Sequence, residues 1–188
     1  MTPFQQSLRD AIDTFKAIGA HEEEIVKCAD VIEQAFLSGN KLLLAGNGGS
    51  ASDAAHISTE FVCRFKGDRR PYPAMALTVD AGLLTAISND YDYQDAFARQ
   101  VQAFGKKGDV LIVISTSGKS RNLLAAIEEA RRLEMSTIAL LGRQGGFTKG
   151  AAEIEIIVEG AETARIQEAQ QFLLHVICEL LEERLPKE

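Results

Sequence analysis

The sequence predicts an α/β fold in which helices flank a parallel five-stranded sheet. From residue 41 onward, short apolar runs alternate with longer segments of helical periodicity. The runs are aliphatic and bounded by glycine, proline or polar residues, which is typical of buried parallel strands. Such alternation gives a layered fold with right-handed crossovers. The expected strands are Leu42–Ala45, Ala74–Thr78, Val110–Ser115, Thr137–Gly142 and Ile154–Val158.

Helices are expected between these strands and at both ends of the chain. The segments 51–65, 81–104, 121–134 and 164–185 have helical character. Residues 1–40 predict two more helices, the first capped by Thr2 with Pro3 at its first position and closed by Gly19. Each carries one apolar stripe, which needs a partner surface on the main domain or on another subunit. We therefore expect one domain over 1–188, with a helical extension (1–40) and an α/β core (41–188).

Composition narrows the classes of protein that this chain can be. A net charge of −7 and a pI of about 5.1 disfavour non-specific binding to nucleic acid. Neither an apolar run long enough to span a membrane nor the pattern of a signal peptide is present, so we expect a cytoplasmic protein. Cys28, Cys63 and Cys178 are odd in number and scattered, which indicates small buried hydrophobic residues in a reducing compartment.

One stretch departs from the acidic balance. The segment 64–70, "RFKGDRR", holds four cations in seven residues. The interpretation that we favour is a solvated loop. The alternative is that one of its arginines reaches an anion.

A glycine-rich loop follows the first expected strand. Residues 44–56 read "LAGNGGSASDAAH", and 46–51 fit the G-x-G-x-x-[G/A] pattern of dinucleotide sites. The loop offers backbone amides at the start of a helix, where negative charge is favoured, and Ser50 with Asp53 can form a capping box. A dinucleotide site also wants an acidic residue about twenty positions on. The first candidate, Asp80, comes thirty-four positions after Gly46, so a nucleotide cofactor is disfavoured.

A second loop, "STSGKS" at 115–120, follows the third expected strand and opens a helix. Hydroxyl donors, amides freed by glycine and a helix N-terminus together favour binding of a phosphate group. The spacing is not that of a Walker A motif. The alternative is a serine-rich turn in which Ser120 caps the helix.

Two polar clusters on different helices complete the candidate site. His56 and Glu60 are four residues apart, so they share a helix face and could bind a divalent metal, act as a base and its orienting partner, or form a surface contact. On the last helix, polar residues interrupt an otherwise apolar face. They are Gln167, Glu168, Gln171 and His175.

At these residues the chain resembles the phosphoheptose isomerase family of the sugar isomerase (SIS) superfamily. The matching segments, in order over most of 41–178, are "GNGGSASDAAH", "RF…RRPYPAMALT", "AISND", "GDVLIVISTSGKS" and "ARIQE…H". The resemblance implies a flavodoxin-like sheet and a homotetramer with sites between subunits, each subunit with one zinc ion. It also implies interconversion of sedoheptulose 7-phosphate and D-glycero-D-manno-heptose 7-phosphate, an entry step of lipopolysaccharide heptose synthesis.

The resemblance also implies roles for individual residues. Matches to the phosphate-binding loop are Ser115, Thr116, Ser117 and Ser120, and matches to other substrate contacts are Asn47, Gly48, Gly49, Ser50, Glu60, Asn89, Asp90 and Gln167. Matches to the metal ligands are His56, Glu60, Gln167 and His175, of which Glu60 and His175 also match the catalytic pair. A carboxylate suits proton transfer at carbon and a histidine suits proton transfer at a hydroxyl. A glutamate cannot both bind zinc tightly and act freely as a base, so the zinc can be structural or partly displaced during turnover.

Two features of the sequence complicate the assignment of the family's residue roles to this chain. Gln170 stands where many relatives have a histidine. Gln167 and His175 are eight residues apart, about 12 Å along a straight helix, so both reach one ion only if Gln167 lies at a fraying helix start or comes from another subunit. Gln171, one turn from His175, is the other candidate ligand.

A rival interpretation is a binding protein of the same subfamily, such as the non-enzymatic homologue that tethers a bacterial replication initiator. That scaffold needs neither a carboxylate base nor a histidine at these two positions. The presence of both Glu60 and His175 favours the enzyme.

Overall fold

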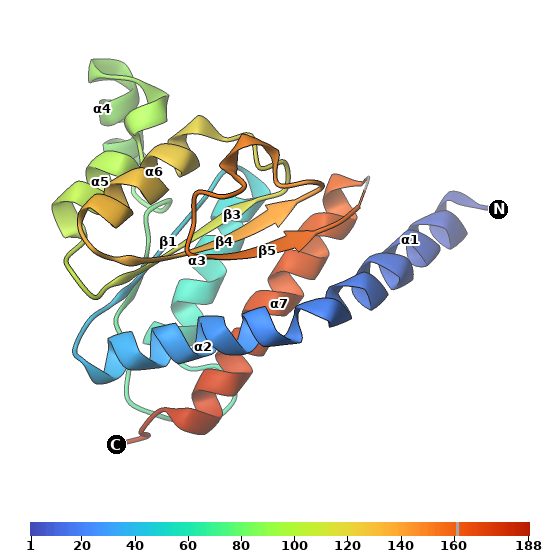
Figure 1. The fold of residues 1–188 in the computed structure, drawn as a ribbon, viewed down its shortest axis with the longest axis horizontal. Helices are drawn as coiled ribbons and strands as arrows, with labels where there is room; N and C mark the ends of the chain where they lie inside the picture. The colour runs from blue at the N-terminus through green and yellow to red at the C-terminus, as the bar shows by residue number, and fades with distance from the viewer. Residues whose placement is uncertain (161) are drawn as a thin grey trace.

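The computed structural model describes residues 1–160 and 162–188 and contains a parallel five-stranded sheet (Figure 1). The strand order is β2-β1-β3-β4-β5, and every neighbouring pair is parallel. The predicted α/β fold is therefore confirmed. The strands are β1 (Leu42–Gly46), β2 (Ala74–Ala76), β3 (Val110–Ser115), β4 (Ser136–Gly142) and β5 (Ile154–Val158).

Helices cover both faces of this sheet because the strands are apolar on both sides. Along β1, Leu42 and Leu44 pack with α2, α3 and α7, whereas Leu43 and Ala45 pack with α5 and α6. All five β1 residues are buried. The helices are α1 (Pro3–Ile18), α2 (Glu22–Leu37), α3 (Gly49–Val62), α4 (Ala81–Asp90), α5 (Ala98–Phe104), α6 (Arg121–Arg132) and α7 (Thr163–Arg184).

The N-terminal helices form as expected and join into one long rod. Thr2 caps α1: its hydroxyl accepts from the Gln5 amide at 3.2 Å, and the Gln5 side chain accepts from the Thr2 amide at 3.0 Å. Gly19 is the C-cap, but a short 3₁₀ turn (Gly19–His21) leads directly into α2. Helix α2 packs on the sheet, while much of α1 extends beyond the body of the molecule (Figure 1).

Three local predictions were wrong. The segment 81–104 is not one helix: the chain leaves α4 at Tyr91, and Asp92 accepts a hydrogen bond from the Gln94 amide at 2.7 Å to start a 3₁₀ turn (Tyr93–Asp95) before α5. Strand β2 ends at Ala76, and the Thr78 hydroxyl instead donates to the Ala51 carbonyl.

The third concerns the start of α3. Its N-cap is Gly48, in a left-handed conformation (φ 58°), without a side-chain cap. Ser50 therefore lies within the first turn, and Asp53 is bound by α7 instead of closing a capping box.

The topology brings the two predicted anion loops to one edge of the sheet. Strands β1 and β3 are neighbours, and the chain leaves β1 for one face and β3 for the other. In open α/β sheets this switch point, at the carboxyl ends of the strands, is where ligands bind. Within the described residues, none of the helices combines the length and apolar character that crossing a membrane requires.

Candidate active site

Three side chains from two helices converge beside the sheet. His56 and Glu60 lie on α3, with His56 Nε2 2.9 Å from Glu60 Oε1. His175 comes from α7, and the ring centroids of the two histidines are 5.0 Å apart. One potential ligand atom from each of the three residues lies within 4.8 Å of the others. Residues up to 119 positions apart in the chain therefore form one cluster of two imidazoles and a carboxylate.

The packing of α3 against α7 produces this convergence. Both helices bury an apolar face on the same side of the sheet, with Ile57 and Phe61 from α3 and Ile177 from α7 in one core. The polar residues that interrupt these faces meet along the seam between the helices. The cluster is half-buried, with the Glu60 side chain 16% exposed and that of His56 40% exposed.

Neighbouring side chains hold the cluster in place. Gln171 Nε2 lies 3.1 Å from His56 Nδ1, so Gln171 contacts the cluster directly. The Phe65 ring stacks on His175 with centroids 5.7 Å apart. Arg69 donates hydrogen bonds to the carbonyls of Glu60 and Phe61. The basic segment 64–70 is therefore tied to the end of α3 and is not simply a solvated loop.

Gln167 contacts a different partner. Its Nε2 donates to Asp53 Oδ2 at 2.9 Å, and its amide also lies against the backbone of Gly49. A Cβ on Gly49 would lie 2.5 Å from Gln167 Nε2, so a larger residue here would displace the Gln167 amide from its present position. The structure thus brings His56, Glu60 and His175 together. Gln167 instead contacts Asp53 and Gly49 of the glycine loop.

Burial shifts two pKa values at the site. The pKa of His175 is lowered by burial first and by the adjacent His56 second, against the opposing effect of Glu60. The pKa of Asp53 is raised by burial, and this outweighs the hydrogen bond from Gln167 and the nearby histidines. His175 is therefore held neutral at physiological pH, the form that can bind a metal or accept a proton.

The glycine loop after β1 is hydrogen-bonded to residues across the switch point, on α6 and before α5. Asn47 and Asn122 exchange side-chain hydrogen bonds of 3.0 and 2.9 Å, and Asn47 Oδ1 also accepts from the Tyr93 hydroxyl at 2.7 Å. Tyr93 and Asn122 carry no motif signal, and the sequence analysis missed them. A cavity of about 440 Å³ lies here, with Asn47 and Ser120 in its wall.

The STSGKS loop has an internal framework of hydrogen bonds. Ser115 Oγ accepts from the Gly118 amide at 3.0 Å and lies 3.5 Å from Ser120 Oγ, and Ser117 Oγ accepts from the Lys119 amide. Ser120 is the N-cap residue of α6, but its side chain makes no capping hydrogen bond with the described residues. Ser120 lines the wall of the cavity of about 440 Å³, and the alternative in which its side chain caps α6 is not supported.

Asn89, Asp90 and Gln170 lie away from the cluster of His56, Glu60 and His175. Asn89 and Asp90 are exposed at the end of α4 and bond to each other, with Asn89 Nδ2 2.9 Å from Asp90 Oδ1. No contact among the described residues joins them to Glu60 or His175. Gln170 points away from the cluster into the core, where its amide donates to the carbonyls of Leu140 and Ser115.

Comparison with known proteins first defines the class. A family model described as SIS domain matches residues 4–142, well over half of the chain. Together with the doubly wound sheet and the serine-rich loop at its switch point, this match makes the chain a member of the SIS domain family.

Three relatives define its place within that family. The phosphoheptose isomerase of Aquifex aeolicus is 50% identical over 163 residues, which cover 87% of this chain and 85% of the relative. That of Clostridium acetobutylicum is 46% identical over 167 residues, or 89% and 85% of the two chains. The structure of a phosphoheptose isomerase from Francisella tularensis superposes with a TM-score of 0.93 at 34% identity and covers 98% of this chain and 100% of that chain. The chain belongs to the phosphoheptose isomerases, and it is an enzyme that isomerises a sugar phosphate.

Proposed function

We propose that this enzyme interconverts sedoheptulose 7-phosphate and D-glycero-D-manno-heptose 7-phosphate, supplying heptose for lipopolysaccharide precursors. The observation that carries the proposal is the half-buried carboxylate of Glu60, paired with two histidines at the seam of α3 and α7. Relatives named phosphoheptose isomerase over most of the chain support the choice of substrate.

Moving a carbonyl between C1 and C2 requires proton transfer at carbon and at oxygen. In the direction from ketose to aldose, Glu60 removes a proton from C1, and the electron pair of that bond forms the C1–C2 double bond of an enediol. The C2 oxygen gains a proton, the C1 hydroxyl later loses one, and Glu60 returns its proton to C2. A carboxylate suits this step because it is readily reprotonated.

His175 is the proposed partner for the transfers at oxygen. Because burial and His56 lower its pKa, the ring is neutral at neutral pH and can pass a proton between the two sugar oxygens. Phe65 stacks on the ring and fixes its plane. The T-shaped contact with His56 holds it beside Glu60.

The cluster also fits the proposed zinc ion, one per subunit. Two imidazoles and a carboxylate within 4.8 Å are a donor set that zinc prefers. His56, Glu60 and His175 would hold the ion, with Gln167 or Gln171 as a neutral fourth ligand, and the ion would be structural or partly displaced while Glu60 acts as the base. When bound, the ion would supply positive charge close to the developing enediolate.

Phosphate recognition is assigned to Ser115, Thr116, Ser117 and Ser120. Their loop precedes α6, and a helix N-terminus favours an anion. The glycine loop at Asn47–Ser50 borders the same switch point and is proposed to bind the sugar, as are Asn89 and Asp90. Binding energy from the phosphate would position C1 and C2 at Glu60.

We further propose a cytoplasmic homotetramer with its sites at subunit interfaces. The apolar stripe of α1 is exposed, with Phe4 75% and Ile12 45% accessible, and a second copy of the chain is the partner that would cover it. Asn89 and Asp90 would then reach a site through assembly, since they lie away from the cluster of their own chain.

Glu60→Gln tests the assignment. We expect isomerase turnover to fall by about 10²–10⁴-fold, the usual contribution of a general base, with melting temperature and oligomeric state unchanged. Glu179→Gln is the matched control, because Glu179 is an exposed α7 carboxylate paired with Lys66 outside the cluster. Wild-type protein that lacks turnover, or a Glu60→Gln variant that keeps full turnover, would overturn the proposal in favour of a binding role.

A further inference from the structure

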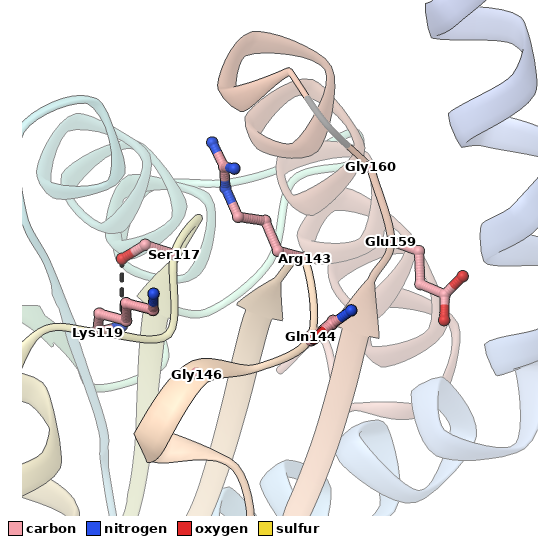
Figure 2. A pocket seen from close by; sticks show the side chains of 7 residues that line it. All are labelled: Ser117, Lys119, Arg143, Gln144, Gly146, Glu159 and Gly160. Atoms are coloured by element: carbon pink, nitrogen blue, oxygen red, sulfur yellow. Dashed lines mark hydrogen bonds between the residues drawn. The ribbon is translucent and has the colours of Figure 1, made fainter.

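A second pocket lies at the same edge of the sheet, over the ends of β3, β4 and β5. Its volume is about 490 Å³ (Figure 2). The loop after β3 contributes one wall and the loops after β4 and β5 contribute the others. The lining residues are Ser117, Lys119, Arg143, Gln144, Gly146, Glu159 and Gly160.

The walls of this pocket are locked together by backbone contacts. A Cβ on Gly118 would lie 2.0 Å from the Gly145 carbonyl oxygen, and one on Gly146 would lie 2.3 Å from that of Gly118. Thr148 donates both its amide and its hydroxyl to the Gly118 carbonyl, at 3.1 and 2.8 Å. The loop after β3 and the loop after β4 therefore form a fixed surface, so a ligand on one contacts the other.

The charge of the pocket points to an anion. Lys119 and Arg143 are exposed side chains from opposite walls, and neither forms a salt bridge with a carboxylate in the described part of the chain. Figure 2 shows the Glu159 side chain turned away from both cations. Arg143 has a left-handed backbone (φ 61°), which is costly for a residue with a Cβ and marks a position that function often requires.

The residues that line the pocket indicate which class of ligand it can bind. Among the described residues, the pocket wall contains no aromatic ring on which a base could stack, but it offers the hydroxyl of Ser117 and the amide of Gln144. These groups suit a polyol that carries a phosphoryl group. Its volume falls in the range of small-molecule sites, about 300–1,000 Å³, and exceeds what a bare anion needs.

The Arg143 wall of the pocket is too far from the proposed catalytic pair for one substrate to reach both. Arg143 Nη2 lies 3.4 Å from Thr163 Oγ1, at the first residue of α7. His175 comes twelve residues later on the same helix, about 18 Å along its axis. A seven-carbon sugar phosphate spans only about 10 Å from C1 to phosphorus, at ~1.3 Å per bond along an extended chain.

We propose that this pocket binds a second phosphorylated polyol, with its phosphoryl group between Lys119 and Arg143, and that the bound ligand regulates the isomerase through the shared 115–120 loop. The regulatory part rests on the proposed function, whereas the binding part does not. Ser117 and Lys119 belong to the loop assigned to the substrate phosphate. Occupancy of the pocket therefore changes how that loop presents its hydroxyls.

Binding is tested by equilibrium dialysis of the full-length protein against radiolabelled inorganic phosphate. We expect two phosphates per chain in the wild type and one in Arg143→Asn, because asparagine tolerates the left-handed backbone. Lys149→Asn, which removes an exposed cation outside this pocket, should keep two. Ser120→Ala should lose the other site. A single phosphate per chain in the wild type, or two in Arg143→Asn, would overturn the inference.

Regulation is tested by assaying turnover with glucitol 6-phosphate as the added polyol. We expect a change in kcat that excess substrate does not reverse, and its loss in Arg143→Asn, whose own kcat and KM stay within about twofold of wild type. Purely competitive inhibition that is equal in both proteins would instead show that the polyol occupies only the substrate site. If the wild type lacks turnover, the proposed function fails, and the dialysis result still decides whether the pocket binds phosphate.

Discussion

Gln167 donates its side-chain amide to Asp53 across 2.9 Å, which joins the first turns of α7 to the first turns of α3. Asp53 is buried, with 6% of its surface exposed, and burial raises its pKa. An ionisable group is kept in such an environment at a cost, and here it orients a neutral amide beside the His56, Glu60 and His175 cluster. Partners of this kind typically tune metal affinity by 10–100-fold.

Asp53→Leu should therefore weaken zinc binding by about 10–100-fold, because Gln167 loses the acceptor that orients it. Chelator-treated protein titrated with Zn²⁺ and followed by melting temperature measures this directly, since a ligand at a hundred times its Kd stabilises by about 2.7 kcal/mol. Asp53→Asn is the matched control, because its Oδ1 still accepts from Gln167. Equal affinity in wild type and Asp53→Leu would contradict the orienting role, and zinc without effect on any of the three would argue against the metal site itself.

Gln170 is expected to contribute to stability through the strands. It is fully buried, and its amide donates to the Leu140 carbonyl at 3.0 Å and the Ser115 carbonyl at 3.4 Å. Its Oε1 finds no hydrogen-bond partner among the described residues. Gln170→Leu should cost about 1–3 kcal/mol, because it removes both hydrogen bonds to these buried carbonyls. Urea denaturation measures the loss, and Gln170→His, which restores an N–H donor, should lose less; a Leu variant as stable as wild type would contradict this.

Much of the fold follows from local sequence pattern. The five apolar runs became the five strands with shifts of one or two residues, because a buried parallel strand needs an unbroken aliphatic segment. The break between α4 and α5 was missed even though residues 88–95, "SNDYDYQD", are mostly polar, because no glycine or proline marks the end of a helix there. The hydrogen bond from the Gln94 amide to Asp92 is a local contact across two residues that starts the 3₁₀ turn after α4.

The candidate site was predictable in its motifs but not in its contacts. His56 and Glu60 share a helix face by spacing alone, whereas their approach to His175 depends on how α3 packs on α7. The sequence predicted that Asp53 helps to cap α3. In the structure, Asp53 instead accepts a long-range hydrogen bond from Gln167. Tyr93 could not be found from sequence, because its bond to Asn47 spans 46 positions and crosses the switch point.

The exposed face of α1 should drive assembly. Phe4, Leu8, Ile12 and Phe15 are 37–75% exposed, and of these Phe15 packs on Phe172 of α7. Ile12→Glu should therefore lower the oligomeric state measured by light scattering on a sizing column, since a charge would be buried at the interface. Asp13→Asn, the adjacent exposed position, should leave the mass unchanged. A wild-type chain that runs as a monomer at micromolar concentration would contradict the proposed tetramer.

The three cysteines should differ sharply in reactivity. Burial, with a smaller contribution from Glu24 for Cys28 and Glu60 for Cys178, raises the pKa of both thiols to about 12, so their reactive thiolate forms are scarce at neutral pH. Cys63, expected from the sequence to be buried, is exposed at the end of α3. A thiol-specific chromophoric reagent at pH 8 should therefore modify one thiol per native chain and three after denaturation. Cys63→Ser should abolish the native reaction, and rapid modification of that variant would show that α2 or α7 opens to solvent.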